Sequence, residues 1–444
     1  MFRNLSEKVK TESWLLNQKN RPSRIFFYLL ILFLPTQLGK HFWPDFSFVY
    51  GVRVDYLSPT FYFTDLIIIF LCFFWIFESR KKIKIKFNIK IFLFLSLFLF
   101  LILGISLSKS PGSGLYGLVK LLEFLILFFY TAKNFRNLNK KIIFSTIFAG
   151  VLFESLLSLA QYVSQSSLNG IFYFFGERSF NSQTPGVADA TLNGQLVLRP
   201  YGTFPHPNVL AAYLYISLYS LLLIFPRIEI KFKKLFLWLI LAIGTIALFA
   251  TLSRIVIFVW ACSALSYLIF LFWKKTRIGF LKKINYVFLF LILIFIVLSF
   301  FTIPVFQRFA QTSFSDESLV QREQLVNDSL EMYGNNPLFG TGLNNFLINL
   351  PSIEKKQKQS FYLQPVHNIF LLALSELGIP GFLYLSGFVV YVFLKIRKQK
   401  KLLILFSGII ALGLFDHYFF TLQQGQILFS LTMGAFLSST KKIG

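Results

Sequence analysis

Long apolar stretches alternate with short polar ones along most of the chain. A helix that crosses a bilayer needs roughly 20 mostly apolar residues, and slightly fewer where snorkelling side chains flank it. Twelve stretches reach or approach this length: residues 25–39, 61–77, 91–107, 117–132, 142–163, 208–226, 235–250, 255–273, 284–303, 368–394, 402–416 and 426–438. The pattern predicts an all-α polytopic membrane protein with about 12 transmembrane helices.

The composition points the same way. Of the 444 residues, 55% are hydrophobic and only 14% are charged, whereas soluble chains carry about 25% charged residues. This excludes a disordered protein, a nucleic-acid binder and an ordinary cytosolic enzyme. Both cysteines, Cys72 and Cys262, lie inside apolar stretches, which excludes a disulfide framework and argues against thiolate metal sites.

The basic residues predict an orientation. Every second gap between the apolar stretches is basic, and these gaps hold 32 of the 44 Lys and Arg residues. Because cytoplasmic loops are enriched in Lys and Arg, both termini are predicted to be cytoplasmic. Residues 1–24 would form a cytoplasmic segment, 25–438 a single membrane domain and 439–444 a cytoplasmic tail. The net charge of +25 thus reflects topology, and no nucleic-acid partner is expected.

The long polar loops lie on the side opposite the basic gaps. With both termini in the cytoplasm, this is the outer side of the membrane. Residues 164–207 and 304–366 form large outer loops, the second between spans 9 and 10, whereas cytoplasmic connections are short. No phosphate-binding glycine loop and no Asp-x-Asp pair occurs. The sequence therefore predicts a preactivated substrate at the outer surface, with no cofactor and no metal.

A first polar cluster ends the loop before the sixth span. It contains Arg199, His206 and Asn208, and Pro207 and Asn208 are typical of a helix start. For His206 and Asn208, two roles remain open: catalysis, or marking the transition from the loop to the helix. An arginine just above an apolar span needs an anionic partner, so Arg199 is predicted to bind either a ligand or a structural acid.

A second cluster is the short turn that ends in Ser253 and Arg254, between spans seven and eight. Burying an unpaired arginine costs a few kcal/mol. We favour anion binding by Arg254 over snorkelling, because so tight a turn leaves little room to snorkel.

A third cluster belongs to the large outer loop and its exit. Residues 316–333 show the apolar spacing of an amphipathic helix that carries Arg322. His367 and Asn368 head the tenth span, with Glu376 further along it. At a helix N-terminus the dipole favours a neutral imidazole, the form that a general base needs, and a capping role for His367 is the alternative.

Further polar groups have no assigned role. Glu123 and Glu154 lie within apolar stretches and are candidates for function, or for structural pairing with Lys120 or Arg254. The turn Asp416-His417-Tyr418 is interpreted as a polar cap.

Taken together, these clusters resemble the O-antigen ligase and O-antigen polymerase superfamily over about residues 190 to 394. The motifs are Arg199-x2-Gly-Thr-Phe-x-His-Pro-Asn, Ser253-Arg254, Asn336-Pro337-Leu-Phe-Gly-x-Gly, His367-Asn368 and Glu376-Leu-Gly-x-Pro-Gly. The resemblance implies a helical membrane glycosyltransferase of the GT-C type, which moves glycan from an undecaprenyl diphosphate carrier to an acceptor with inversion and without metal. It implies that His367 is the catalytic histidine and that Arg199, Arg254 and Arg322 contact the diphosphate.

The implied partners are the carrier-linked glycan, an acceptor glycan or glycolipid and membrane lipids. The implied location is a bacterial plasma membrane, with the active site facing the periplasm or the outside. A glycan polymerase would share these motifs, so ligase and polymerase both stay open. A non-enzymatic flippase for lipid-linked oligosaccharides ranks behind, because it predicts internal repeats and ionisable groups at the bilayer midplane.

Overall fold

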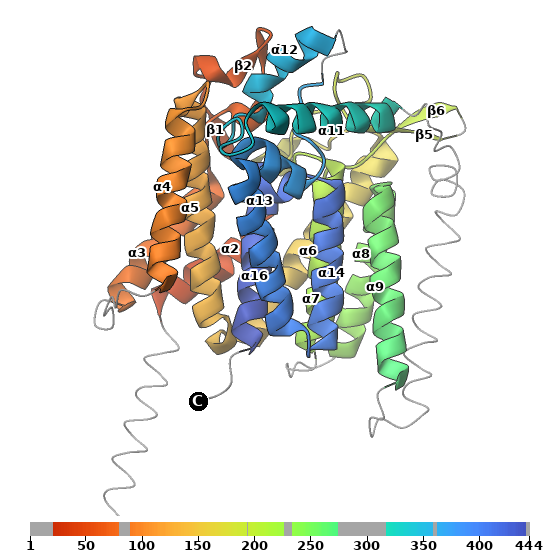
Figure 1. Cartoon of the computed structure of the whole chain (residues 1–444). Coiled ribbons are helices and arrows are strands. Elements are labelled where there is room, and N and C mark those ends of the chain that lie inside the picture. Colours follow the sequence, from red (N-terminus) through yellow and green to blue (C-terminus); the bar gives the residue numbers. More distant parts are fainter. Residues whose placement is uncertain are drawn as a thin grey trace, which may run out of the picture.

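A computed structural model describes residues 21–79, 89–192, 194–225, 233–273, 317–357 and 362–440. The chain forms an upright helical bundle whose upper end is covered by short strands and two further helices (Figure 1). The α-helices described are α2 (Pro22–Phe33), α3 (Phe63–Ser79), α4 (Ile89–Ser106), α5 (Pro111–Asn134), α6 (Lys140–Ser164), α7 (Pro207–Ile224), α8 (Lys233–Ala250), α9 (Arg254–Trp273), α11 (Glu317–Asn335), α12 (Phe346–Gln357), α13 (Ile369–Ile396), α14 (Lys400–Phe415), α15 (Tyr418–Thr421) and α16 (Gln423–Thr440).

Every predicted span that falls on described residues coincides with a helix. The ninth, 284–303, lies outside the described residues. The first is shorter than predicted, since α2 ends at Phe33, two residues before Pro35, which lacks the N–H that would continue the helix.

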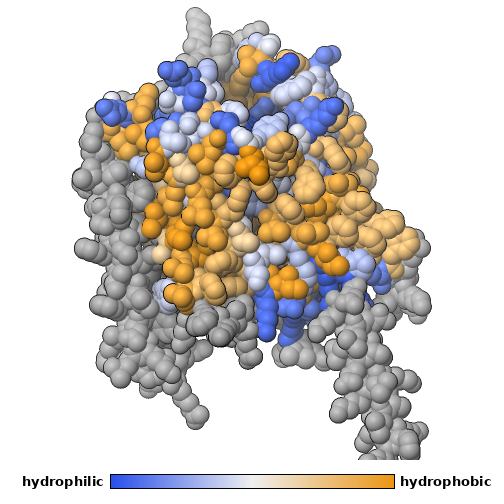
Figure 2. All heavy atoms as spheres, turned by 180° about the vertical axis from the view of Figure 1, so that it is seen from behind, coloured by the Kyte–Doolittle hydropathy of each residue, from blue (hydrophilic) through white to orange (hydrophobic). Residues whose placement is uncertain are grey.

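Four helices among the described residues are long and apolar enough to cross a bilayer: Pro111–Asn137, α6, α7 and α13. On the face shown in Figure 2, hydrophobic side chains form a broad band between a hydrophilic upper end and hydrophilic patches below. These features are those of an integral membrane protein. The count of about 12 spans stays a prediction.

Helix α7 forms the centre of the bundle. Most of its residues are buried, without a polar face, as expected for a helix that neighbours surround. It contacts α6, α8, α9, α14 and α16. Two of its three tyrosine hydroxyls find partners on those neighbours: the Tyr215 hydroxyl lies 2.9 Å from the Ser263 hydroxyl, and Tyr219 donates to the backbone oxygen of Lys401 at 3.2 Å. The N-terminus of α7 is thereby held rigidly beneath the upper end.

The cap, defined as residues 39–62, 164–206 and 317–357, covers that upper end. It holds three two-stranded antiparallel sheets among the described residues: β1 (Gly39–His41) with β4 (Thr60–Tyr62), β2 (Phe48–Val49) with β3 (Val52–Arg53), and β5 (Asp189–Leu192) with β6 (Gln195–Leu198). Short 3₁₀ turns accompany them, η1 (Asp45–Ser47), η2 (Asp55–Leu57) and η4 (Gly170–Phe175), while η3 (Phe135–Asn137) extends α5. Helices α11 and α12 also belong to this end (Figure 1). The prediction of an all-α protein therefore needs the addition of these small sheets.

Candidate functional site

The first predicted cluster lies where the cap meets α7. His206 is the N-cap of α7, and its Nδ1 accepts a hydrogen bond from the backbone N–H of Asn208 at 3.1 Å. Pro207 occupies the first helical position. The sequence placed the cap near Asn208, but the histidine takes this role, so the Asn208 side chain is left to make other contacts.

Those contacts link three separate parts of the chain. Asn208 Nδ2 donates to Asp416 Oδ2 at 2.9 Å, and Asn208 Oδ1 accepts from Arg199 Nη2 at 2.6 Å and from the Ser253 hydroxyl at 3.1 Å. Arg199 is 7% exposed, and its Nε donates to the backbone oxygen of Thr251 at 2.7 Å. Arg199 thus links the cap to the turn between α8 and α9. The acceptors in these two hydrogen bonds are uncharged oxygens, the Thr251 carbonyl and the Asn208 amide oxygen.

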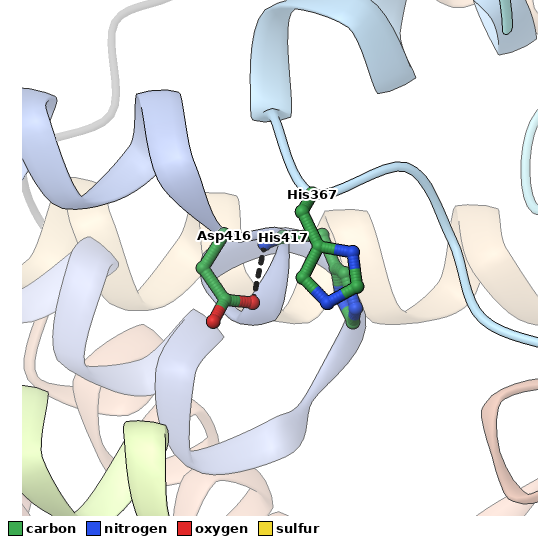
Figure 3. A group of neighbouring side chains, drawn as sticks. All are labelled: His367, Asp416 and His417. Atoms are coloured by element: carbon green, nitrogen blue, oxygen red, sulfur yellow. Dashed lines mark hydrogen bonds between the residues drawn. The ribbon is translucent and has the colours of Figure 1, made fainter. Parts of the chain in front are cut away.

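Asp416 lies between α14 and α15, beside the imidazoles of His367 and His417 (Figure 3). Its Oδ1 accepts the backbone N–H of His417 at 2.8 Å. The rings of His367 and His417 meet edge to face with centroids 5.0 Å apart, and Tyr56 meets His417 in the same way at 5.4 Å. The polar turn after α14 is therefore part of the site and not a surface cap.

The charges in this group follow from burial and from its neighbours. Burial lowers the pKa of His206 and of His417 to about 3, so both rings are neutral at pH 7. Burial alone would raise the pKa of Asp416, but the neighbouring groups His367, His417 and Arg322 outweigh it and lower this pKa to about 2. The site therefore holds one carboxylate among neutral imidazoles.

His367 differs from the other two histidines. Burial lowers its pKa, Asp416 opposes that shift and Arg322 adds to it, so desolvation is the leading cause where the sequence suggested the helix dipole. Its Nδ1 is buried and has no hydrogen-bond partner among the described residues. The capping role falls to Asn368, whose Oδ1 accepts from the backbone N–H groups of Phe370 and Leu371 at 2.8 and 3.1 Å.

Two predicted arginines flank the group. Arg322 lies on α11, the helix expected over 316–333, and its charge lowers the pKa of His206, His367 and His417. Arg254 is the first residue of α9 and directly follows Ser253, whose hydroxyl contacts Asn208. Arg254 thus begins its helix beside the network, and the charge of Arg322 acts on the imidazoles.

The same group contains a possible set of metal ligands. His367, Asp416 and His417 each offer a ligand atom, and these atoms lie within 4.8 Å of one another. Two imidazoles and a carboxylate are a donor set that divalent transition metals accept. Arg322, which lies close enough to affect all three groups, opposes the approach of a cation.

Glu376 is placed differently from the other predicted residues. Its carboxylate accepts the backbone N–H groups of Asn344 at 3.0 Å and Phe346 at 3.1 Å, at the start of α12. Two residues on, Gly378 has φ +62°, and a Cβ there would lie 2.4 Å from the backbone oxygen of Pro337. Gly378 is the non-helical residue at which α13 kinks. Its close approach to Pro337 and the hydrogen bonds of Glu376 together hold the loop before α12 against α13, and this loop supports the cap.

The two intramembrane acids also have local partners. Glu154 accepts from the backbone N–H and the hydroxyl of Thr203 at 2.9 and 2.6 Å. Glu123 pairs with Lys120 at 3.2 Å. Of the structural pairings considered from the sequence, that with Lys120 is present, while Glu154 binds the chain just before His206 and so helps to position it.

A cavity of about 570 Å³ adjoins the site. Part of its wall is apolar and comes from α4, α5, α13 and α16, through residues such as Leu101, Phe128, Phe388 and Met433. Tyr56 and His206 also line it. Because Tyr56 lines the cavity and packs on His417, the cavity lies next to the group around Asp416, with Tyr56 between them.

The fold and site together define a helical membrane protein with a cavity next to a group formed by His367, Asp416 and His417. In a comparison with family models, residues 237–386 match the O-antigen ligase family. This match confirms the resemblance found in the sequence, and it covers Arg254, Arg322, His367 and Glu376. A search of the curated proteins found no match.

Three residues of the site have no assigned role in the sequence analysis: Asp416, His417 and Tyr56. Asp416 and His417 do carry a signal, since they are adjacent polar residues between two apolar stretches. Tyr56 has none, because only the folded cap brings residues 39–62 against the turn after α14.

Proposed function

We propose that this chain transfers an oligo- or polysaccharide from undecaprenyl diphosphate to a sugar hydroxyl of an acceptor. The observation that carries the proposal is His367 beside Asp416, with an Nδ1 that has no partner among the described residues, next to a cavity whose wall is partly apolar. A buried neutral imidazole fits a general base. The O-antigen ligase match supports the reaction class.

In the proposed reaction the acceptor oxygen bonds to the anomeric carbon of the donor sugar, while the bond from that carbon to the diphosphate breaks. His367 takes the proton of the acceptor hydroxyl, and Asp416 stabilises the imidazolium that results. Arg254 and Arg322 stabilise the charge that develops on the departing lipid diphosphate. Attack opposite the leaving group inverts the anomeric centre, and no step requires a metal.

The cavity has an apolar part and a polar end, which suit the polyprenyl chain and the diphosphate of such a donor. A polyprenyl chain is apolar and would lie against Leu101, Phe128 and Phe388. Its diphosphate would then meet the polar end near His206. Arg199 has a supporting position in this scheme, because two of its N–H groups hold Thr251 and Asn208.

We place the site at the outer face of a bacterial plasma membrane, with both termini cytoplasmic, because every second gap between apolar stretches is basic. A reporter that is active only outside the cytoplasm should work when fused after Gln357, in the cap, and stay silent after Lys398, between α13 and α14. The reverse pattern would place the site in the cytoplasm and remove the case for a preactivated donor.

The reaction itself is tested with purified protein in lipid nanodiscs. Undecaprenyl diphosphate carrying a short oligosaccharide is mixed with candidate acceptors, and products are separated by mass. A ligase puts the glycan on a different acceptor, and a polymerase lengthens the glycan on the carrier. A flippase moves the lipid without forming a glycosidic bond, so the absence of new bonds with every acceptor, together with lipid transport in vesicles, would overturn the enzyme assignment.

A further inference from the structure

A second polar group lines the cavity, apart from the histidines and the predicted arginines. Lys120 on α5 donates to Asp65 at 2.6 Å and to Glu123 at 3.2 Å. The three side chains are 9%, 6% and 14% exposed. One ammonium faces two carboxylates, so this group has no positive charge left to attract a phosphate.

Gln423, at the start of α16, adds an unused acceptor. Its Nε2 donates to Asp65 Oδ1, and to the Thr64 hydroxyl at 3.1 Å. Because a carboxylate can only accept, the amide nitrogen must face Asp65, and this fixes the orientation of the amide. Its Oε1 is then left without a partner among the described residues, although Gln423 is only 4% exposed and lines the cavity.

Gln37 repeats this arrangement in the same cavity. Its Nε2 lies 3.5 Å from the backbone oxygen of Phe204, and its Oε1 is buried without a partner among the residues described. Gln37 lines the same cavity. A buried carbonyl that accepts no hydrogen bond costs about 1–3 kcal/mol, so two of them in one cavity indicate a ligand or water that donates to them.

His41 supplies a third acceptor on the cavity wall. The hydroxyls of Thr60 and Ser58 lie 2.8 and 3.3 Å from His41 Nδ1, and each also has a backbone oxygen to donate to, at 3.0 and 2.8 Å. The tautomer that satisfies both hydroxyls carries its proton on Nδ1, and we assign that one. Nε2 of the neutral ring then carries a lone pair. His41 also stacks on Trp43 with ring centroids 5.6 Å apart, and flat aromatic surfaces of this kind pack well against the apolar face of a sugar ring.

We infer that Gln37, Gln423 and His41 form a saccharide subsite in the cavity, with Lys120 and Asp65 fixing its wall. The chemistry that fits is a group with several hydroxyl donors, and a sugar ring is such a group. A diphosphate has only acceptors at neutral pH and finds no free cation in this group of residues. This inference rests on the proposed function, and it places a sugar of the donor or of the acceptor here while the diphosphate lies near the arginines.

The test measures binding to the full chain in nanodiscs with three probes. Undecaprenyl diphosphate reports the lipid and its phosphates, undecaprenyl diphosphate-N-acetylglucosamine adds one sugar, and triacetylchitotriose is a lipid-free saccharide. Gln423→Met and Gln37→Met keep the side-chain length and remove the acceptor. We expect each to weaken saccharide-dependent binding about three- to tenfold, with binding of undecaprenyl diphosphate unchanged.

The controls separate this effect from folding. Gln37→Met loses only a 3.5 Å hydrogen bond within the protein, so its thermal unfolding should match the wild type even if Gln423→Met is destabilised. Gln426→Met changes another glutamine on the cavity wall whose Oε1 is not among the buried unpartnered atoms. We expect it to change binding less than either test variant.

The probes also tell the two sugars apart. Loss of the extra affinity for the N-acetylglucosamine lipid assigns the subsite to the donor, and loss of chitotriose binding assigns it to the acceptor. If both variants bind all probes as the wild type does, water satisfies these oxygens and the subsite is overturned, while the proposed function stands. If the wild type binds neither lipid, the proposed function fails together with the subsite.

Discussion

Replacing His367 by alanine is expected to reduce glycan transfer by about 10²–10⁴-fold, the usual effect of removing a general base. Binding of undecaprenyl diphosphate-linked glycan should stay largely intact, because the arginines hold the diphosphate in our scheme. His367 Nδ1 has no partner among the described residues, so its loss breaks no hydrogen bond there and the protein should fold. The measurement is the transfer rate of purified variant beside donor affinity.

Asn368→Ala is the matched control. Asn368 caps α13 through two backbone N–H groups, and loss of such a cap costs about 1 kcal/mol of stability. This variant should unfold more easily and yet turn over at a much higher rate per folded molecule than His367→Ala. A well-folded His367→Ala protein with near-normal turnover would remove this residue from the mechanism.

The pH dependence of the same reaction gives a second measure of His367. A base must be neutral to act, and burial lowers the pKa of His367 below 6.5. Transfer should therefore persist as the pH falls through 6.5 and decline only below it. Asp416 raises this pKa, so Asp416→Asn should move the acidic decline to still lower pH as well as slow the reaction. A shift to higher pH would contradict the assignment of His367 as the base.

The helices of this protein could be predicted because each bilayer-spanning helix is a continuous apolar run, which depends on local sequence alone. The sheets of the cap could not. Strands β2 and β3 have two residues each, too few to show an alternating pattern, and they pair across the two-residue turn Tyr50-Gly51. The first span was predicted too long because hydropathy alone does not register the stop at Pro35.

In the site, too, some features could be predicted from local sequence and others depend on how the chain folds. His367 and Asn368 are adjacent, and the sequence indicates both, but only the structure shows that Asn368 caps the helix while His367 Nδ1 has no partner in the described part of the chain. Asp416 lies 49 positions after His367, so their proximity depends on how α13 and α14 pack. Arg199 was expected to need an anion. Its hydrogen bonds to the Thr251 carbonyl and the Asn208 amide could not be read from the sequence, and its charge opposes the rise that burial causes in the pKa of Asp189.

These contacts lead us to expect that the arginines separate into two kinds. Arg254→Ala and Arg322→Ala should each weaken binding of undecaprenyl diphosphate about 10- to 100-fold, since a hydrogen bond to a charged group contributes about 1.5–3 kcal/mol. Arg254→Lys keeps the charge and loses the planar fork, so it should stay badly impaired while inserting normally. Near-normal transfer by Arg254→Lys would mean that charge alone suffices there.

Arg199→Lys should instead act on stability. Arg199 is 7% exposed and donates in two directions, from Nε to Thr251 and from Nη2 to Asn208. A lysine ammonium is a single point and cannot reproduce that geometry. We therefore expect a fall of about 1–3 kcal/mol in the free energy of unfolding, with donor affinity per folded molecule little changed. The measurements are denaturant unfolding in detergent and lipid binding in nanodiscs. If Arg199→Lys keeps wild-type stability and loses the lipid, Arg199 is a diphosphate ligand after all, and its hydrogen bond to Asn208, which donates to Asp416, would place the bound diphosphate beside the histidines.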